Sequence, residues 1–336
     1  MNKCLYILCF FIFSFSIQAT AIIDNETVVR HKNCFEGRFA TFENWQTFIS
    51  NKIAKKIENK DMRVKRLAMF ERNFKAVDFK RFKNNLECQS IKYMVDGHQV
   101  SGFVVKPKNT NGKLPVLIYN RGGNGNFGAV VFAALMRNIF PVAEQGFIII
   151  GSQYRGTLTK NKTAADEFGG KDVDDVVALF DLIQSITAAD AERIGMFGAS
   201  RGGMQSYLTL KRTNKVKAVA VIAGKSDAIV GLKQRPNMEA VYRKRIPNYE
   251  QNKQVELEKR SVLYWLDKIP QNVPILLLHG MSDERVSVEQ SISLAEALEK
   301  AGMPHKLVLY PGDNHGLTQN KVKATQEIVT WFNKHL

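Results

Sequence analysis

The chain has 336 residues, and its 48 Lys and Arg against 32 Asp and Glu give a net charge of +16. This length is enough for one large α/β domain with a small extension. The charge excess favours anionic surroundings, such as an acidic envelope surface or an acidic substrate, and a solvated lysine-rich surface is the alternative. No nucleic-acid motif with interleaved aromatic residues accompanies the charge, which argues against a nucleic-acid-binding module.

The first 21 residues have the features of a cleavable signal peptide. Lys3 supplies a short positive start, residues 5–17 form an apolar run, and Ala19-Thr20-Ala21 offers the small residues that a signal peptidase accepts. A membrane anchor is the alternative, but it needs roughly 20 apolar residues and no second such run follows. We therefore expect a secreted or periplasmic protein with no membrane span after cleavage.

Two of the four cysteines, Cys34 and Cys88, remain after removal of this segment. In an oxidising compartment an isolated pair often closes a disulfide, which here would tie an N-terminal extension to the start of the main domain. Two separate thiols are the alternative. No Cys-x-x-Cys motif and no His/Cys cluster at ligand spacing is present, so the sequence predicts no metal site.

Residues 22–88 are predicted to form a helical N-terminal extension. Between residues 40 and 86, apolar side chains recur at helical spacing with Lys and Arg between them. Such a stripe usually packs on the rest of the protein, and recognition of a partner is the alternative. The stripe comprises Trp45, Phe48, Ile49, Ile53, Ile57, Leu67, Phe70 and Phe74.

After Glu87 the pattern changes from helical to strand-like. Residues 91–95 and 100–106 flank Asp96-Gly97 and predict an antiparallel hairpin. Short apolar runs without a polar break then alternate with helical stretches, as expected of parallel strands covered on both faces. These runs are residues 116–119, 147–150, 194–197, 218–223, 275–278 and 307–310. Residues 89–336 are therefore predicted to form an α/β domain around a mostly parallel sheet.

The segment Gly198-Ala199-Ser200-Arg201-Gly202 matches the Gly-x-Ser-x-Gly nucleophile elbow. It follows the predicted strand 194–197 and precedes a helix-compatible stretch, which is the context that this motif needs. Glycines are required because the strand turns sharply into the helix and flanking side chains would collide with their neighbours. The turn presents the serine hydroxyl beside the N-terminal amides of the helix. Ser200 is therefore the predicted nucleophile of an α/β-hydrolase fold.

A serine hydroxyl needs a base to take its proton and a carboxylate to orient that base. This fold supplies the three residues in the order serine, acid, histidine along the chain. Asp283 lies just past a predicted buried strand and is the predicted acid, with Glu284 as the alternative. His315 lies in a glycine-flanked loop after the last predicted strand and is the predicted base. Asp313 is interpreted as a turn residue and His279 as a structural histidine.

Catalysis of this kind also needs two backbone N–H donors that stabilise the oxyanion. One is predicted at Arg201, directly after the nucleophile. The other is expected from Gly122 or Gly123, in the glycine-rich loop after strand 116–119, where the backbone can approach a substrate. The loop lacks the pattern of a phosphate-binding loop. The predicted chemistry needs no cofactor.

Together these motifs resemble the catalytic domain of the prolyl oligopeptidase family of serine peptidases. The resemblance covers about residues 90–336 and implies the fold, with an eight-stranded type of sheet and helices on both faces, the triad and hydrolytic activity. It rests on the Gly-Gly loop at Gly122, Gln153-Tyr154-Arg155-Gly156, residues 172–183, residues 193–203, the Leu-His-Gly-Met-Ser-Asp block and the Asp-Asn-His-Gly block.

The sequence departs from the family pattern in two places. Similar domains usually follow a β-propeller that restricts access to small peptides, whereas about 70 mature residues, predicted to be helical, precede the domain here. Selection by peptide length is therefore not carried over. Arg121 stands where family members typically show His or Tyr, so the oxyanion hole is expected to use backbone amides.

Arg121, Tyr154 and Arg155 are candidate substrate-binding residues. If Arg121 and Arg155 lie with Arg201 at the mouth of the site, they predict a substrate with a carboxylate or another anion, because arginine pairs with such groups through two bonds. The alternative is structural, with Arg155 bracing a loop. Residues 224–260 are predicted to form a small helical lid.

The sequence as a whole predicts a secreted serine hydrolase that cleaves a peptide, amide or ester bond through an acyl-enzyme on Ser200. A small peptide or ester, with or without a negative charge, is the expected substrate. The family resemblance favours a serine peptidase, and a carboxylesterase or deacylase with the same triad is the alternative. A non-catalytic binding protein on a hydrolase fold is a third hypothesis.

Overall fold

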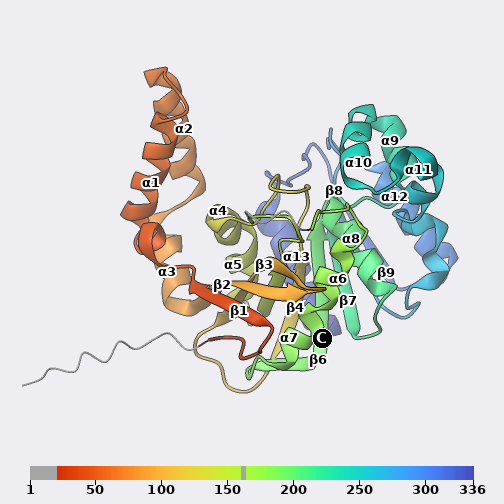
Figure 1. Ribbon diagram of the computed structural model, residues 1–336, viewed down its shortest axis with the longest axis horizontal. Helices are drawn as coiled ribbons and strands as arrows, with labels where there is room; N and C mark the ends of the chain where they lie inside the picture. Colours follow the sequence, from red (N-terminus) through yellow and green to blue (C-terminus); the bar gives the residue numbers. More distant parts are fainter. Residues whose placement is uncertain (1–20, 160–163) are drawn as a thin grey trace, which may run out of the picture.

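The computed structural model describes residues 21–159 and 164–336, so the predicted signal peptide, apart from Ala21, lies outside the described residues. All strands of the described residues belong to one nine-stranded sheet in the order β1-β2-β3-β5-β4-β6-β7-β8-β9 (Figure 1). Their bounds are β1 Val28–Asn33, β2 Leu86–Val95, β3 His98–Pro107, β4 Leu114–Asn120, β5 Ile148–Ser152, β6 Ala189–Ala199, β7 Val216–Ile222, β8 Ile275–Gly280 and β9 His305–Tyr310.

The predicted parallel sheet is confirmed. Strands β4 to β9 pair in parallel, and each predicted apolar run overlaps one of them. The predicted hairpin is also present, because β2 and β3 pair antiparallel and Val95 stands opposite His98. Its turn uses Asp96 and Gly97, whose φ angles are 49° and 73°. Since β2 begins at Leu86, the predicted domain boundary after residue 88 falls inside a strand.

The sheet has nine strands instead of the expected eight because β1 adds an edge strand. This segment pairs antiparallel with β2, from Val28 opposite Tyr93 to Asn33 opposite Gln89. The prediction that residues 22–88 form a helical extension is therefore wrong for residues 28–33, and also for residues 86–88, where β2 begins. The four interior residues of β1 are exposed, so no apolar alternation marks the strand, and backbone pairing with β2 provides its structure.

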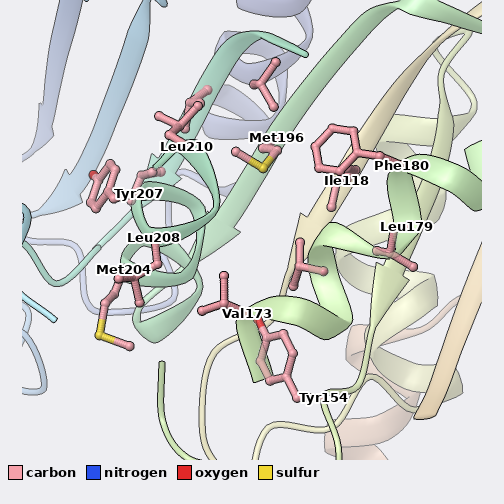
Figure 2. Packing of buried hydrophobic residues seen from close by; sticks show 14 of the residues in the cluster. Ile118, Tyr154, Val173, Leu179, Phe180, Met196, Met204, Tyr207, Leu208 and Leu210 are labelled. Carbon is pink, nitrogen blue, oxygen red and sulfur yellow. The ribbon is translucent and has the colours of Figure 1, made fainter. Parts of the chain in front are cut away.

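Helices cover both faces of the sheet and enclose two apolar clusters. Along β4, Val116 and Ile118 join one cluster and Leu117 and Tyr119 join the other, because successive side chains of a strand point to opposite faces. Figure 2 shows part of the first cluster, in which Leu179 and Phe180 of α7 (Leu179–Gln184) lie close to Ile118 of β4, and Leu210 of α8 (Arg201–Leu210) lies toward Met196 of β6.

One face carries most of the helices that follow β5. They are α6 Asp172–Val177, α7 Leu179–Gln184, α8 Arg201–Leu210, α9 Ala228–Gln234, α10 Glu239–Arg245, α11 Tyr249–Glu258 and α12 Glu289–Lys300. The other face carries α3 Ala76–Asn85, α4 Phe132–Ala134, α5 Phe140–Ala143 and α13 Lys321–His335. Two further helices, α1 Phe42–Ala54 and α2 Lys60–Asn73, join the apolar cluster of this face through Trp45 and Phe70. Short turns of helix occupy Gly37–Phe39, Leu135–Ile139, Pro236–Met238, Val262–Tyr264 and Leu266–Lys268.

The segment between residues 40 and 86 forms the helices α1, α2 and α3, as predicted. In Figure 1, α1 and α2 project away from the sheet. Thr41 Oγ1 and Asn59 Oδ1 accept backbone hydrogen bonds at the starts of α1 and α2, at 3.1 and 2.9 Å. Trp45 anchors α1 on the main domain, since its ring centre lies 5.0 Å from that of Phe132. The Cys34 and Cys88 sulfurs form a disulfide that joins the extension to β2.

The segment predicted as a lid, residues 224–260, is helical and contains α9, α10 and α11. It lies between β7 and β8, and Figure 1 places it at one side of the molecule, next to α12. Tyr242 of α10 is fully buried and packs edge-on against Phe168, with 5.4 Å between ring centres. The lid is therefore tied to the main core. None of the helices within residues 21–159 and 164–336 combines the length and the apolar composition of a membrane span.

Candidate active site

Ser200 lies at the sharp turn between β6 and α8. Its backbone has φ 59° and ψ −123°, a conformation that costs a non-glycine residue about 1–3 kcal/mol. Hydrogen bonds hold the turn, because Ser200 N donates to Ile222 O at 2.8 Å and Gly203 N donates to Ser200 O at 3.0 Å. A Cβ on Gly202 would overlap the carbonyl oxygen of Asn120. The close contact explains why the predicted elbow needs glycine at position 202.

The predicted acid and base contact each other. Nδ1 of His315 lies 2.7 Å from Oδ2 of Asp283, and Oδ1 of Asp283 accepts N–H bonds from Arg285 and Val286 at 2.8 and 3.0 Å. Burial raises the pKa of Asp283, but hydrogen bonds from its histidine neighbours outweigh burial and hold that pKa well below the usual range. The carboxyl therefore stays ionised at neutral pH. Glu284, the alternative acid, is exposed.

The loops after β8 and β9, which carry these two side chains, pack closely. A Cβ on Gly280 would overlap the carbonyl oxygen of Asp313, and Ser282 N donates to that same oxygen at 2.9 Å. Asp313 is fully buried. Its carboxylate accepts N–H bonds from Asn314 and Asn320, both at 2.9 Å. This residue, predicted to be a turn residue, therefore shapes the loop that holds His315.

His279 is a second histidine in contact with the predicted acid. Its Nε2 lies 3.1 Å from Asp283 Oδ2 and 3.0 Å from Val286 O, and its Nδ1 lies 2.7 Å from Ser291 Oγ. Both neighbours of Nε2 are hydrogen-bond acceptors, so Nε2 carries a proton that it donates to them. The sequence predicted a structural histidine here. Its contact with Asp283 is visible only after folding.

The glycine-rich loop after β4 lies against the elbow. A Cβ on Gly122 would lie 3.2 Å from Ser200 Cβ, and the φ of Gly123 is 75°, so both positions favour glycine. Within the parts of the chain that the structure describes, the backbone amides of Gly122, Gly123 and Arg201 donate no hydrogen bond to another protein group. These predicted oxyanion donors remain available to a substrate.

The structure contradicts the prediction that Arg121 and Tyr154 bind substrate. Arg121 is only 1% exposed, and its guanidinium donates to backbone carbonyl oxygens. Its Nε donates to Gln153 O and its Nη2 donates to Gly125 O, each over a distance of 2.9 Å. The Tyr154 ring is fully buried, and its hydroxyl donates to Arg121 O at 3.0 Å. Both side chains brace the glycine-rich loop from beneath.

Arg155 is also a bracing residue, which corrects the substrate-binding prediction in favour of its structural alternative. Its guanidinium forms ion pairs with Asp175 at 2.7 Å and with Asp96 at 3.0 Å. The side chain is 3% exposed. All three candidate side chains are committed to internal partners, so none of them reaches the substrate.

The side chain of Arg201 turns into the protein beneath the elbow. It pairs with Asp166 at 2.7 Å and Asp172 at 2.6 Å and donates to Gly123 O at 2.9 Å. Burial lowers the pKa of Arg201, but the two carboxylates more than compensate and raise it. Asp166 in turn accepts the Gly125 amide at 2.7 Å. Arg201 thus links the nucleophile turn to the glycine-rich loop, a role that spacing along the chain did not indicate.

One cleft of about 410 Å³ joins the elbow, the acid loop and the lid. Its wall includes Ser200 and Asp283 but none of Arg121, Tyr154 and Arg155. In the described residues, no group of three or more His, Cys, Asp or Glu side chains is placed to hold a metal ion. The remaining lining is Gly123, Asn124, Phe127, Phe168, Arg201, Lys225, Gly231, Gln234, Arg235, Met238, Val241, Glu284, Arg285, Val286, Ser287 and Gln290.

Comparison with known sequences agrees with this geometry. Residues 133–336 match the family model of the prolyl oligopeptidase family. The "Uncharacterized peptidase YtmA" of Bacillus subtilis is 27% identical over 243 residues, which are 71% of this chain and 91% of that protein. "Dipeptidyl-peptidase 5" of Porphyromonas gingivalis is 27% identical over 254 residues, which are 72% of this chain and 36% of that protein.

Solved structures with the same fold include a Pyrococcus horikoshii acylaminoacyl peptidase, with a TM-score of 0.65 and 21% identity. That match covers 78% of this chain and 44% of the peptidase. A puromycin-hydrolyzing peptidase of Mycobacterium tuberculosis has a TM-score of 0.61 and 24% identity, covering 74% of this chain and 39% of its own. The chain therefore spans most of YtmA but less than half of these larger relatives.

Proposed function

Because the chain belongs to the prolyl oligopeptidase family and is a serine hydrolase, we propose that it cleaves small peptides or acylated amino acids through Ser200. His315 acts as the base and Asp283 as the acid that orients it. The observation that carries this proposal is the 2.7 Å contact between His315 Nδ1 and Asp283 Oδ2, beside a cleft that Ser200 and Asp283 both line. Peptidase activity follows from the family and from relatives named as peptidases.

The tautomer of His315 follows from its partner. Asp283 Oδ2 can only accept a hydrogen bond when the carboxyl is ionised, so Nδ1 of His315 carries a proton. Nε2 is then free to take the proton of the Ser200 hydroxyl as its oxygen attacks the substrate carbonyl. His315 next gives this proton to the leaving amine. Water, activated by the same nitrogen, releases the acyl group.

The oxyanion of the tetrahedral intermediate is stabilised by backbone amides in this proposal. The donors are Arg201 N and an amide of Gly122 or Gly123, which are available at the elbow and in the adjacent loop. In a serine protease whose donor was removed by mutation, one such N–H group lowered the activation barrier by roughly 3 kcal/mol. The internal pairs of Arg121 and Arg201 keep these amides in place before the substrate arrives.

Export is part of the proposal. The leader-like composition of residues 1–21 supports it, and so does the disulfide between Cys34 and Cys88, because disulfides persist in oxidising compartments. Detection of the mature protein, with residue 22 at or near its N-terminus, in the periplasm or medium of expressing cells tests this part. Retention of an uncleaved chain in the cytosol contradicts it.

Covalent labelling with a fluorophosphonate tests the proposed nucleophile. Wild-type protein is expected to be labelled and Ser200→Ala is not, since capture requires an activated serine. Aminoacyl, dipeptidyl and N-acylaminoacyl amides are then compared with short-chain esters. Turnover of amides supports a peptidase, and turnover of esters alone indicates a carboxylesterase or deacylase. Equal labelling of wild type and Ser200→Ala contradicts the assignment of Ser200.

A further inference from the structure

The cleft beside Ser200 contains a buried ammonium group. Lys225 follows β7, the strand that pairs with the Ser200-bearing β6, and the residue is only 7% exposed. Its Nζ donates a hydrogen bond to the Tyr242 hydroxyl and lies 5.0 Å from the Tyr242 ring centre and 5.8 Å from that of Phe168. Among the described residues, no carboxylate forms an ion pair with this ammonium.

Two other buried cations near the site have carboxylate partners, and the guanidinium of a third, Arg121, donates to several carbonyl oxygens. In the described part of the chain, Lys225 has neither kind of partner. Arg201 has Asp166 and Asp172, and Arg260 pairs with Glu256 at 2.6 Å. Asp227, two residues after Lys225, is the nearest acid in sequence. Its Oδ1 accepts the amides of Ile229 and Val230 at 2.7 and 3.0 Å, at the start of α9. Burial of a charge without a counterion is costly, and an anionic ligand would reduce this cost.

The structure leaves room for a ligand in front of this ammonium. A Cβ on Gly231 of α9 would lie 3.8 Å from Lys225 Nζ and 3.8 Å from Gln290 Nε2. Because glycine has no side chain, the space between these two nitrogen atoms and α9 stays open. Gln290 Oε1 accepts the amides of Ser226 and Asp227, both at 2.9 Å, and this leaves Nε2 as a second donor near Gly231. All three residues line the cleft that contains Ser200.

The charges on the rest of the cleft wall favour the same kind of ligand. Arg235 and Arg285 line the cleft together with Lys225. Of the two carboxylates on the wall, Asp283 is committed to histidine and backbone donors, and Glu284 is exposed. Apart from the ion-paired Arg201, the wall thus carries three basic side chains against two carboxylates, a balance that favours an anionic ligand.

We propose that the cleft selects acyl groups that carry a carboxylate, with Lys225 as the ion-pair partner and Gln290 as a second donor. For a peptide substrate, the matching group is an Asp or Glu side chain on the residue that acylates Ser200. The inference rests on the proposed function, since it names the substrate class of the same site. It replaces the arginines predicted from sequence, which are committed elsewhere, with a lysine that faces the cleft.

The test compares pairs of peptide amides that differ in one charge. In the first set of pairs, the residue before the scissile bond is Glu in one peptide and Gln in the other, or Asp in one and Asn in the other. In a second pair, the leaving group contains Glu in one peptide and Gln in the other. Wild type is expected to cleave the Glu amide at least tenfold faster than the Gln amide in kcat/KM, with no such preference in the leaving group. Lys225→Met is expected to reduce this ratio to about one, and Lys225→Glu to favour Lys over Glu.

Lys233→Met is the matched control, because it removes an exposed lysine from α9, the helix that follows Lys225, and it is expected to keep the wild-type ratio. Gly231→Ala, which fills part of the space before the ammonium, is expected to lower kcat/KM for the Glu amide more than for the Gln amide. An N-terminal succinyl cap on a neutral residue distinguishes a terminal carboxylate from a side-chain carboxylate. Enhancement by either source, lost in Lys225→Met, supports the inference.

Failure of the inference and failure of the proposed function give different results. Equal rates on the Glu and Gln amides, or a Glu preference that persists in Lys225→Met, would overturn the inference. If the fluorophosphonate still labels Ser200 in that case, the proposed function stands. Absence of both labelling and hydrolysis overturns the proposed function and the inference with it. Labelling of Lys225→Met at Ser200 shows that this variant is folded.

Discussion

His279 Nε2 lies 3.1 Å from Asp283 Oδ2, the same oxygen that His315 Nδ1 approaches to 2.7 Å. The acid therefore lies between two imidazoles, one buried and one 16% exposed. Because His279 is also bound to Ser291 Oγ, it holds the carboxylate in one orientation. We interpret His279 as a positioning residue that fixes Asp283 for His315.

Removal of this contact is expected to slow catalysis without weakening substrate binding. A hydrogen bond to a charged group is worth about 1.5–3 kcal/mol, so His279→Leu should lower kcat by roughly ten- to a hundredfold with little change in KM. His279→Gln, which retains a side-chain N–H donor, should recover part of the rate. Steady-state kinetics of both variants on one substrate make the comparison. An equal loss in kcat and in folded fraction for both variants would indicate a purely structural role.

Asp283 and the adjacent Glu284 provide a direct test of the acid. Asp283→Asn is expected to lower kcat by about 10⁴-fold, because an amide no longer holds the imidazole of His315 in the required tautomer. Glu284→Gln is the matched control and should change kcat less than about threefold, since this side chain is exposed. The reverse result would assign the acid to Glu284.

The buried pair network of Arg201 should matter for stability. Arg201→Met leaves Asp166 and Asp172 without their cation and is expected to lower the free energy of unfolding by about 3–5 kcal/mol. Arg212→Met is the control, because Arg212 and Asp174 form an ion pair whose side chains are 53% and 30% exposed. Its loss should cost less than about 1 kcal/mol. Urea denaturation of the three proteins measures both values.

Stability should also fall at acidic pH in a way that depends on Asp166. Burial raises the pKa of this group, but Arg201 and backbone N–H donors outweigh burial and hold that pKa far below the usual range. An aspartate in the unfolded chain has a pKa of about 3.9, so the stabilisation is complete above this pH and is lost as pH falls toward the folded pKa. Unfolding free energies measured between about pH 2 and 5 should show a shallower slope for Asp166→Asn.

Reduction of the disulfide should loosen the N-terminal extension. The bond between Cys34 and Cys88 closes a loop with a sequence separation of 54. Its removal by Cys34→Ser with Cys88→Ser is expected to cost about 2–4 kcal/mol. A lower thermal midpoint for the double variant, and for wild type in reductant, tests this expectation. Identical midpoints with and without reductant would contradict it.

The sequence by itself determined the parallel sheet, the elbow and the order of the predicted catalytic residues. These follow from local rules, because unbroken apolar runs predict covered strands and the glycines beside Ser200 predict a sharp strand-to-helix turn. The edge strand β1 escaped prediction because its interior residues are exposed and its structure depends on pairing with β2.

Only the tertiary structure decided which cations meet anions inside the protein and which face the cleft. Arg121, Arg155 and Lys225 are all basic residues that follow strands in the sequence. In the folded protein Arg121 contacts carbonyl oxygens and Arg155 contacts carboxylates, whereas an open space lies in front of Lys225. The partners lie 20 or more residues away along the chain in most of these contacts. Electrostatic pairing depends on distance in space, and sequence patterns report only distance along the chain.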